Sequence, residues 1–243
     1  MKIVDAVWEK RNLGVETCEI IVENKSDIEG FWETLPQIDS EYLVVKFPTG
    51  LVEFADRLTD NGFRFIEATV ACHYDIRKEY NLNSVQKRFF DNCDYDIMNN
   101  DDLEELHTNL CDTLFETDRI ALDPHFTIQQ ANNRYWNWIN DEIERGAEIY
   151  KILYKQKSVG FFGLKGPKNK PYEFLAGIYK PFQNVIGSIM NYMAVEAAKE
   201  HGAIELHGVF STNNRGAFAN HMLMGYVLDS VENVFVKHNI KNR

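Results

Sequence analysis

The chain has 243 residues, of which 44% are hydrophobic and 26% are charged, a composition typical of globular proteins. This length allows one large domain or two of ordinary size, and either can bury a sizeable core. A formal net charge of −11 disfavours nucleic acid and anionic membranes as partners, and no apolar run approaches the roughly 18 residues that a membrane span requires.

The two ends of the chain differ in charge. Residues 151–243 hold 12 Lys and Arg against 6 Asp and Glu, a net charge of +6, so residues 1–150 carry −17. This asymmetry indicates either a solvated acidic surface on the first part or an anionic ligand bound by the second. Charge alone leaves both readings open.

The amino terminus and the cysteines indicate an intracellular protein. The first residues, MKIVDAVWEKRN, carry a charge every few positions and lack the apolar region of a signal peptide, so we expect a cytoplasmic location. The four cysteines lie far apart, with no C-x-x-C pair and no nearby paired histidines: Cys18, Cys72, Cys93 and Cys111. They predict reduced, mostly buried thiols and no metal site.

The first part of the chain alternates strand and helix patterns. Strands are predicted at 15–23, 41–47 and 63–76, and helices at 28–35 and 51–62. Ser26 or Asp27 is the expected cap of the first helix. Residues 79–112 are rich in Asn and Asp and predict a linker followed by a short helix at 103–110. We expect two domains, 1–95 and 96–243.

The second part predicts the order α-β-β-β-α-β-α-β. Thr127 and Gln130 form a capping box that begins a helix, whose core face includes Tyr135 and Trp138 and leaves Trp136 free. The later elements are a hairpin around the KQKS turn, a strand at 171–180, a helix at 185–202, a strand at 203–211, a short helix at 214–225 and a final pair of strands at 226–238.

Four strings in this order resemble the GNAT superfamily of N-acetyltransferases over residues 115–237. They are KSVGFFGLK, YEFLAGIYKPFQNVIGSIMNYMAVEAAKEHG, AIELHGVFSTNN and NRGAFANHMLMGY. In the last string, Asn214, Ala217, Gly225 and Tyr226 match the family's N-x-x-A-x-x-x-Y-x-x-x-G-[FY] in register. No P-loop, dinucleotide fingerprint, G-x-S-x-G or H-E-x-x-H motif occurs.

The resemblance implies an α/β (α+β) chain with the GNAT fold, a mixed and mostly antiparallel sheet with helices on both faces. The string EYLVVKFP…GFRFIEATV also resembles the TDP-fucosamine acetyltransferase group, in which a truncated GNAT-like half precedes a complete one. The implied activity is transfer of an acetyl group from acetyl-CoA to a primary amine of a small molecule, such as an amino sugar or a nucleotide-linked amino sugar. The sequence does not determine the oligomeric state, and a homodimer is one option that stays open.

The family's loop signature, Q/R-x-x-G-x-G/A, is degenerate in this chain. The best register runs over Gln183, Asn184, Val185, Ile186, Gly187 and Ser188. Ile186 replaces the first glycine and Ser188 the second Gly/Ala, whereas a register shifted by one gives Gly187 the second position and places Phe182 where Gln or Arg belongs. By resemblance, this loop receives the pyrophosphate of acetyl-CoA at a helix amino terminus.

The resemblance also implies the pantetheine path and the acid. Four residues of the strand at 171–180 would follow the pantetheine: Leu175, Ala176, Gly177 and Ile178. Asn214 and His221 are seven residues apart, so they share a helix face with the small Ala217 between them. His221 stands where the family usually has a tyrosine general acid. Its imidazolium is a stronger acid than a thiol, so it can protonate the departing thiolate.

The general base and the acceptor are less determined. Glu173 and His207 are the two candidates, with Glu173 on the strand face that Gly177 shares; Trp136 could form a wall for a sugar or ring. The acidic first part of the chain favours a cationic amine over a diphosphate. Two alternatives stay open: a non-catalytic acyl-CoA-binding protein, and a tandem-GNAT aminoacyltransferase that uses charged tRNA.

Overall fold

The computed structural model describes residues 1–112 and 114–239. Its amino-terminal part contains β1 (Lys2–Asp5), α1 (Val7–Leu13), β2 (Thr17–Ile21), α2 (Ile28–Thr34), β3 (Tyr42–Pro48), α3 (Val52–Asp60), β4 (Arg64–Asp75), α4 (Ser84–Phe90), β5 (Cys93–Ile97) and α5 (Asn100–Cys111). The following part contains α6 (Arg119–Leu122), α7 (Ile128–Glu144), β6 (Glu148–Tyr154), β7 (Lys157–Lys165), β8 (Tyr172–Ile178), α8 (Gln183–Ile186), α9 (Met190–Glu200), β9 (Glu205–Ser211), α10 (Arg215–Met224) and β10 (Val227–His238). Among the described helices, none is long and apolar enough to cross a membrane.

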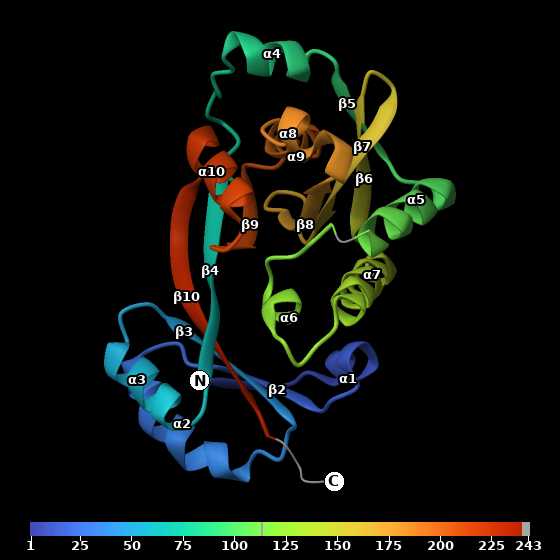
Figure 1. Ribbon diagram of the computed structural model, residues 1–243. Coiled ribbons are helices and arrows are strands. Elements are labelled where there is room, and N and C mark those ends of the chain that lie inside the picture. Colours follow the sequence, from blue (N-terminus) through green and yellow to red (C-terminus); the bar gives the residue numbers. More distant parts are fainter. Residues whose placement is uncertain (113, 240–243) are drawn as a thin grey trace.

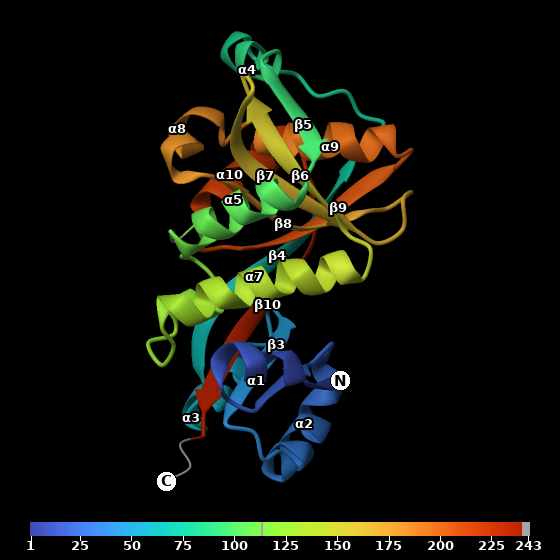
Figure 2. The same cartoon turned by 90° about the vertical axis from the view of Figure 1, so that its right-hand side faces the viewer.

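The described strands form one sheet of ten, in the order β1-β2-β3-β10-β4-β9-β8-β7-β6-β5. The pairs β2–β3 and β8–β9 are parallel, and the other neighbours are antiparallel. Helices cover both faces (Figures 1 and 2). The predicted fold class, a mixed and mostly antiparallel sheet between helices, is confirmed.

Two helical layers pack against the strands β6–β8 from opposite sides. Neighbouring residues of one strand point to opposite faces, so Phe161 and Phe162 enter different cores. Phe161 packs with α5 and α7, which Figure 2 shows in front of the sheet, and Phe162 packs with α9 on the other face. The capping box of Thr127 and Gln130 begins α7 as predicted, because each side chain accepts the other residue's backbone N–H.

The last strand differs from the prediction. Residues 226–238 were expected to form two strands, but they form the single strand β10, which lies between β3 and β4. Its register with β4 shifts between Leu228 and Ser230 and again between Val234 and Phe235. These shifts are irregularities of the β-bulge kind, which bend a strand without ending it.

Other elements also differ from the sequence-based expectation. The predicted linker at 79–112 contains α4 and the edge strand β5 in addition to the expected helix α5. The helix predicted at 185–202 is divided into α8 and α9 by a turn at residues 187–189. The strand β1 and the helix α1 precede the first predicted strand.

A buried ion-pair network joins the helix α1 and the strand β2 to the helices α6 and α7. One Nη of Arg119 lies 2.8 Å from Glu9 and 2.7 Å from Glu19, and Arg134 also contacts Glu9 at 2.8 Å. Arg119 and Glu9 are almost wholly buried. Breaking such a pair leaves a buried charge unpaired, so the network fixes how α1, β2 and α6 fit together.

Candidate functional site

The strands β8 and β9 separate soon after they meet. Their parallel ladder has two pairs, Tyr172 with His207 and Glu173 with Gly208. Beyond Glu173, β8 keeps its partner β7 but leaves β9, so its other edge faces open space. A cavity of about 580 Å³ lies there, a size typical of small-molecule sites.

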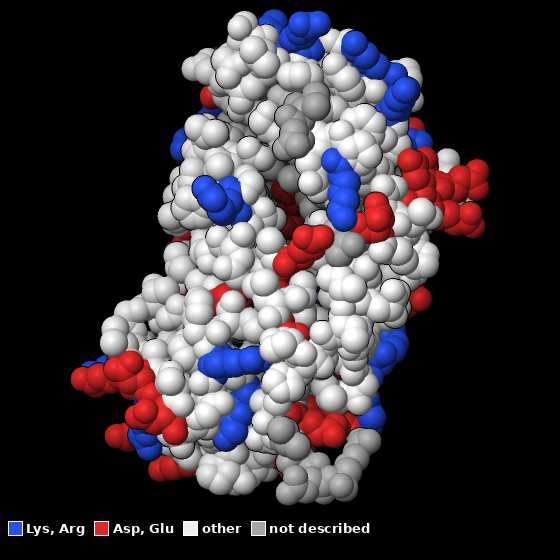
Figure 3. Space-filling model, in the orientation of Figure 1, with Lys and Arg blue, Asp and Glu red and all other residues white. Residues whose placement is uncertain are grey.

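The cavity wall comes from four parts of the chain: the segment between α5 and α6, the helix α7, the diverging strands, and the helices α8 to α10. Its lining includes Leu114, Phe115, Glu116, Asp118, Tyr135, Trp138, Glu173, Phe210, Ser211, Asn220 and His221. Figure 3 shows the hollow near the middle of one face, with Asp and Glu atoms inside it and beside its mouth. The separated strands therefore open into an acidic, partly aromatic pocket.

Glu173 stands at the point where the strands part. The residue is only 7% exposed, and its Oε1 is buried without a hydrogen-bond partner among the described residues. Burial raises the pKa of this carboxyl to about 8. A carboxyl that titrates near neutral pH is suited to accept a proton from a substrate.

His221 lines the cavity from α10 and is largely buried. Its Nδ1 lies 2.7 Å from the carbonyl oxygen of Ala217, so Nδ1 carries a proton and Nε2 is the nitrogen that can gain one. The ring packs 4.6 Å from those of Phe210 and Tyr226. Burial lowers the pKa of this imidazole, which makes the neutral form the resting form.

The predicted cofactor residues divide into three sets. Seven line the cavity: Leu175, Ala176, Gly177, Ile178, Gln183, Gly187 and Asn214. Ile186 is fully buried in the core around α9, and Ser188 is half-buried outside the lining. The side chains of Asn184 and Val185 lie outside the described part of the structure.

The aromatic wall of the cavity differs in part from the prediction. Trp136 stacks on His107, with 4.5 Å between the rings, and is absent from the cavity lining. Tyr135 and Trp138 pack in the core between α7 and the sheet, as helical period predicts, and they also line the cavity. The second base candidate, His207, is also absent from the lining and lies 3.0 Å from Glu205.

Asn214 has a structural part in the site. Its side chain accepts the backbone N–H of Ala217 and so caps α10. Asn220, one turn before the end of the helix, donates to the carbonyl oxygen of Gly187 at 2.8 Å. Together these bonds hold α10 against the loop at 183–188.

The fold of this chain is similar to those of several solved structures. A GCN5-related N-acetyltransferase from Sphaerobacter thermophilus has a TM-score of 0.61 at 8% identity, over 98% of this chain and 75% of that chain. A tandem GNAT protein from the clavulanic acid biosynthesis pathway has a TM-score of 0.55 at 10% identity, over 91% of this chain and 75% of that chain. A GCN5-related N-acetyltransferase from Kribbella flavida has a TM-score of 0.54 at 10% identity, over 91% of this chain and 81% of that chain. The chain has the GNAT fold. No model of a known family and no curated protein matches its sequence.

Within this GNAT fold, the departure at Ile186 has a physical explanation. The side chain points into the core and leaves the cavity side of the loop to the backbone. The close approach occurs one residue later, because a Cβ on Gly187 would lie 2.7 Å from the carbonyl oxygen of Gln183. The loop therefore needs its glycine at 187 and accepts a large residue at 186.

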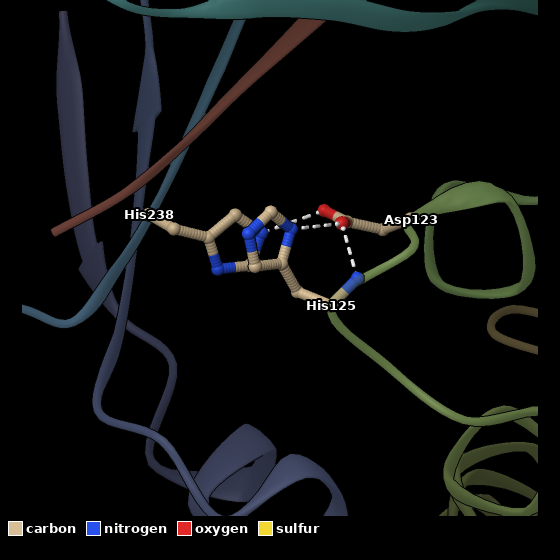
Figure 4. A group of neighbouring side chains, drawn as sticks. All are labelled: Asp123, His125 and His238. Carbon is tan, nitrogen blue, oxygen red and sulfur yellow. Dashed lines mark hydrogen bonds and ion pairs between the residues drawn. The ribbon is translucent and has the colours of Figure 1, made fainter. Parts of the chain in front are cut away.

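One cluster outside the cavity has the donor set of a metal site. Asp123, His125 and His238 offer ligand atoms within 4.8 Å of one another, and the two imidazoles stack 3.9 Å apart beside the carboxylate (Figure 4). Arg64 forms an ion pair with the same carboxylate and lies 3.3 Å from His125. Because this guanidinium already balances the Asp123 charge, the cluster is a complete polar network that ties the end of β10 to the segment before α7.

Proposed function

We propose that the protein is an N-acyltransferase that moves an acetyl group from acetyl-CoA to a primary amine of a small molecule. The observation that carries the proposal is the buried, unpartnered carboxyl of Glu173 at the point where β8 and β9 separate in a GNAT fold. A carboxyl in this position has no structural partner to satisfy it, so a substrate group is the natural one.

Glu173 would prepare the amine. An alkylammonium near pKa 10 must lose a proton before its nitrogen can attack. A carboxylate whose conjugate acid has a pKa of about 8 accepts that proton at less cost than an ordinary glutamate does, because the two pKa values lie closer together. The ionised fraction of Glu173 rises through neutral pH, so the rate should rise with it.

The transfer itself would take place along the free edge of β8. Once the ammonium has given one proton to Glu173, the neutral amine nitrogen bonds to the acetyl carbon and loses its second proton to Nε2 of His221, and the carbon–sulfur bond breaks to release the thiolate of coenzyme A. Residues 175–178 line the cavity on the edge that has no β9 partner, where backbone N–H groups can stabilise the oxyanion. The loop at 183–188 would receive the pyrophosphate, with Lys180 nearby.

His221 would act on the departing sulfur. Its Nδ1–H is held by Ala217, so a proton that arrives at Nε2 makes an imidazolium with one N–H free to donate. Because the neutral ring is the resting form, the proton that His221 donates is the one that the amine nitrogen loses as the amide forms. The thiolate then leaves as the free thiol.

The direct test is release of free thiol from acetyl-CoA in the presence of a panel of primary amines. We expect amine-dependent release in the wild type and a loss of about a hundredfold in Glu173→Gln, since general bases contribute on that order. Glu33→Gln, an exposed glutamate on α2, is the matched control and should keep the wild-type rate. Stabilisation by acetyl-CoA without thiol release from any amine would instead favour the acyl-CoA-binding alternative.

A further inference from the structure

The cavity wall carries an excess of carboxylates. Among its described lining residues, Glu116, Asp118 and Glu173 are acidic, and Lys180 is the one Lys or Arg. Lys180 and Glu116 form a long ion pair of 3.8 Å between two exposed side chains. Carboxyl groups outnumber cationic side chains on this wall, so away from Lys180 and the loop at 183–188 a cationic acceptor is favoured over an anionic one.

Glu173 is an independent indication of a cationic ligand. Its side chain is more than nine-tenths buried, it lines the cavity, and its Oε1 has no hydrogen-bond partner among the described residues. Burying a carboxyl without a partner is costly, and an ammonium group supplies both the missing donors and the opposite charge. One amino group of the ligand therefore belongs beside Glu173.

The other two carboxylates lie on the segment between α5 and α6 and still have capacity to accept. Asp118 uses Oδ1 to cap α6, its Oδ2 forms an ion pair of 3.7 Å with Arg134, and its side chain is also a hydrogen-bond partner of Tyr135. Glu116 is 62% exposed at the cavity mouth. Each carboxylate oxygen can accept more than one donor, so this segment can hold a second positive group.

Aromatic surface joins the two acidic positions. Phe115, Tyr135 and Trp138 line the same cavity as Glu116, Asp118 and Glu173. Aromatic faces attract both methylene groups and cations, and neither interaction requires a hydrogen-bond partner on the ligand. This wall suits an alkyl spacer between two amino groups.

We infer that the acceptor is a diamine or polyamine: one primary amine reacts beside Glu173, and a second cationic group is bound by Asp118 and Glu116. The inference rests on the proposed acyl transfer and specifies its substrate class. It also disfavours the nucleotide-linked amino sugar implied by the family resemblance, because a diphosphate beside these carboxylates would be repelled.

The test compares three amines of equal chain length that differ only at the far end: diaminobutane, aminobutanol and aminobutyrate. Thiol release from acetyl-CoA should show kcat/KM falling in that order, with about a tenfold advantage of the diamine over the alcohol, as expected for one retained charge pair. Raising the ionic strength should reduce this ratio, because salt screens the charges at the mouth.

Two variants locate the second cation. Glu116→Gln changes an exposed side chain and Asp118→Asn keeps a residue able to cap α6, so neither should unfold the protein. Both should lower the diamine-to-alcohol ratio, whereas Glu104→Gln, an exposed glutamate on α5, should leave it unchanged. Equal or better use of aminobutanol or aminobutyrate would overturn the diamine inference and leave acyl transfer standing. Absence of thiol release with all three amines and with a wider panel would overturn both.

Discussion

Glu173 and Gly208 form the last pair of the ladder between β8 and β9, and the cavity opens directly beyond them. A glycine opposite the glutamate adds no side chain to this part of β9. The carboxyl is therefore enclosed by protein yet meets no donor from the neighbouring strand. This burial without a partner makes Glu173 a candidate base, and it also lowers the free energy of unfolding when the carboxyl is ionised.

Replacing Glu173 by Gln should stabilise the protein at high pH. Its folded pKa, about 8, lies above the ordinary value of 4.5, so the native state holds the proton more tightly than the unfolded state. The stability contribution of Glu173 is thus full below pH 4.5 and is lost as the pH rises through 8. By urea unfolding at pH 9, Glu173→Gln should exceed the wild type by about 2–4 kcal/mol, and at pH 4.5 the difference should nearly vanish. A variant less stable than the wild type at pH 9 would show that the carboxyl has a partner.

His221→Phe should separate packing from chemistry. Phenylalanine keeps the ring contacts with Phe210 and Tyr226 but removes the titrating nitrogen. Burial lowers the imidazole pKa, so the stability that His221 contributes is present above its ordinary pKa of 6.5 and is lost as the pH falls through the lower folded value. The variant should therefore gain stability relative to the wild type between pH 7 and pH 5, while thiol release falls at least about tenfold. Unchanged turnover would make His221 a bystander.

Asp123→Asn should weaken the network at the end of β10. Burial alone would raise the pKa of Asp123, but hydrogen bonds from His238 and His125 outweigh it and hold the pKa well below its ordinary value. The charged form is thus the stabilising one above pH 4, and this contribution is lost only in strong acid. At pH 7 the variant should lose about 1.5–3 kcal/mol in urea unfolding, the usual value for hydrogen bonds to a charged group. A loss below 0.5 kcal/mol would mean that Arg64 finds another partner.

Gly160→Ala should disturb the cavity edge of β8 through packing. A Cβ at Gly160 would lie 2.5 Å from the carbonyl oxygen of Gly177, so β7 or β8 must shift. We expect a loss of about 1–3 kcal/mol and a raised KM for acetyl-CoA, since β8 lines the cavity. Gly30→Ala is the control: nothing lies within 4 Å of its Cβ, and alanine in a helix should add about 0.5–1 kcal/mol. Equal effects of both changes on KM would contradict this account.

Local sequence patterns were sufficient to predict most strands of the sheet and most of its helices. The capping box at Thr127 and the KQKS turn each mark an element boundary, and both occur where predicted; Lys155 and Gln156 adopt the positive φ of a tight hairpin turn. The strand β5 was missed because it lies at the sheet edge, where exposed Asp94 and Asp96 break the apolar pattern. The division at residue 95 stays a prediction, and that position lies inside β5.

The site was predictable in part, and the reason lies in what periodicity measures. Helical spacing correctly placed Tyr135 and Trp138 on the inner face of α7, but it could not show that the space beneath them is a cavity. Glu116 and Asp118 belong to no motif, so only the folded chain brings them to Glu173. Glu173 itself was found through its position on the strand, whereas its missing partner follows from the parting of two strands that are distant in sequence.

The position of β10 between β3 and β4 has a consequence for synthesis of the chain. As β3 and β4 leave the ribosome, the strand that must separate and join them has yet to be made. Until residues 227–238 emerge, both strands expose open edges with unpaired backbone groups, which invite pairing with other chains. The acidic side chains of the first 150 residues oppose such pairing during synthesis, because like charges repel one nascent chain from another.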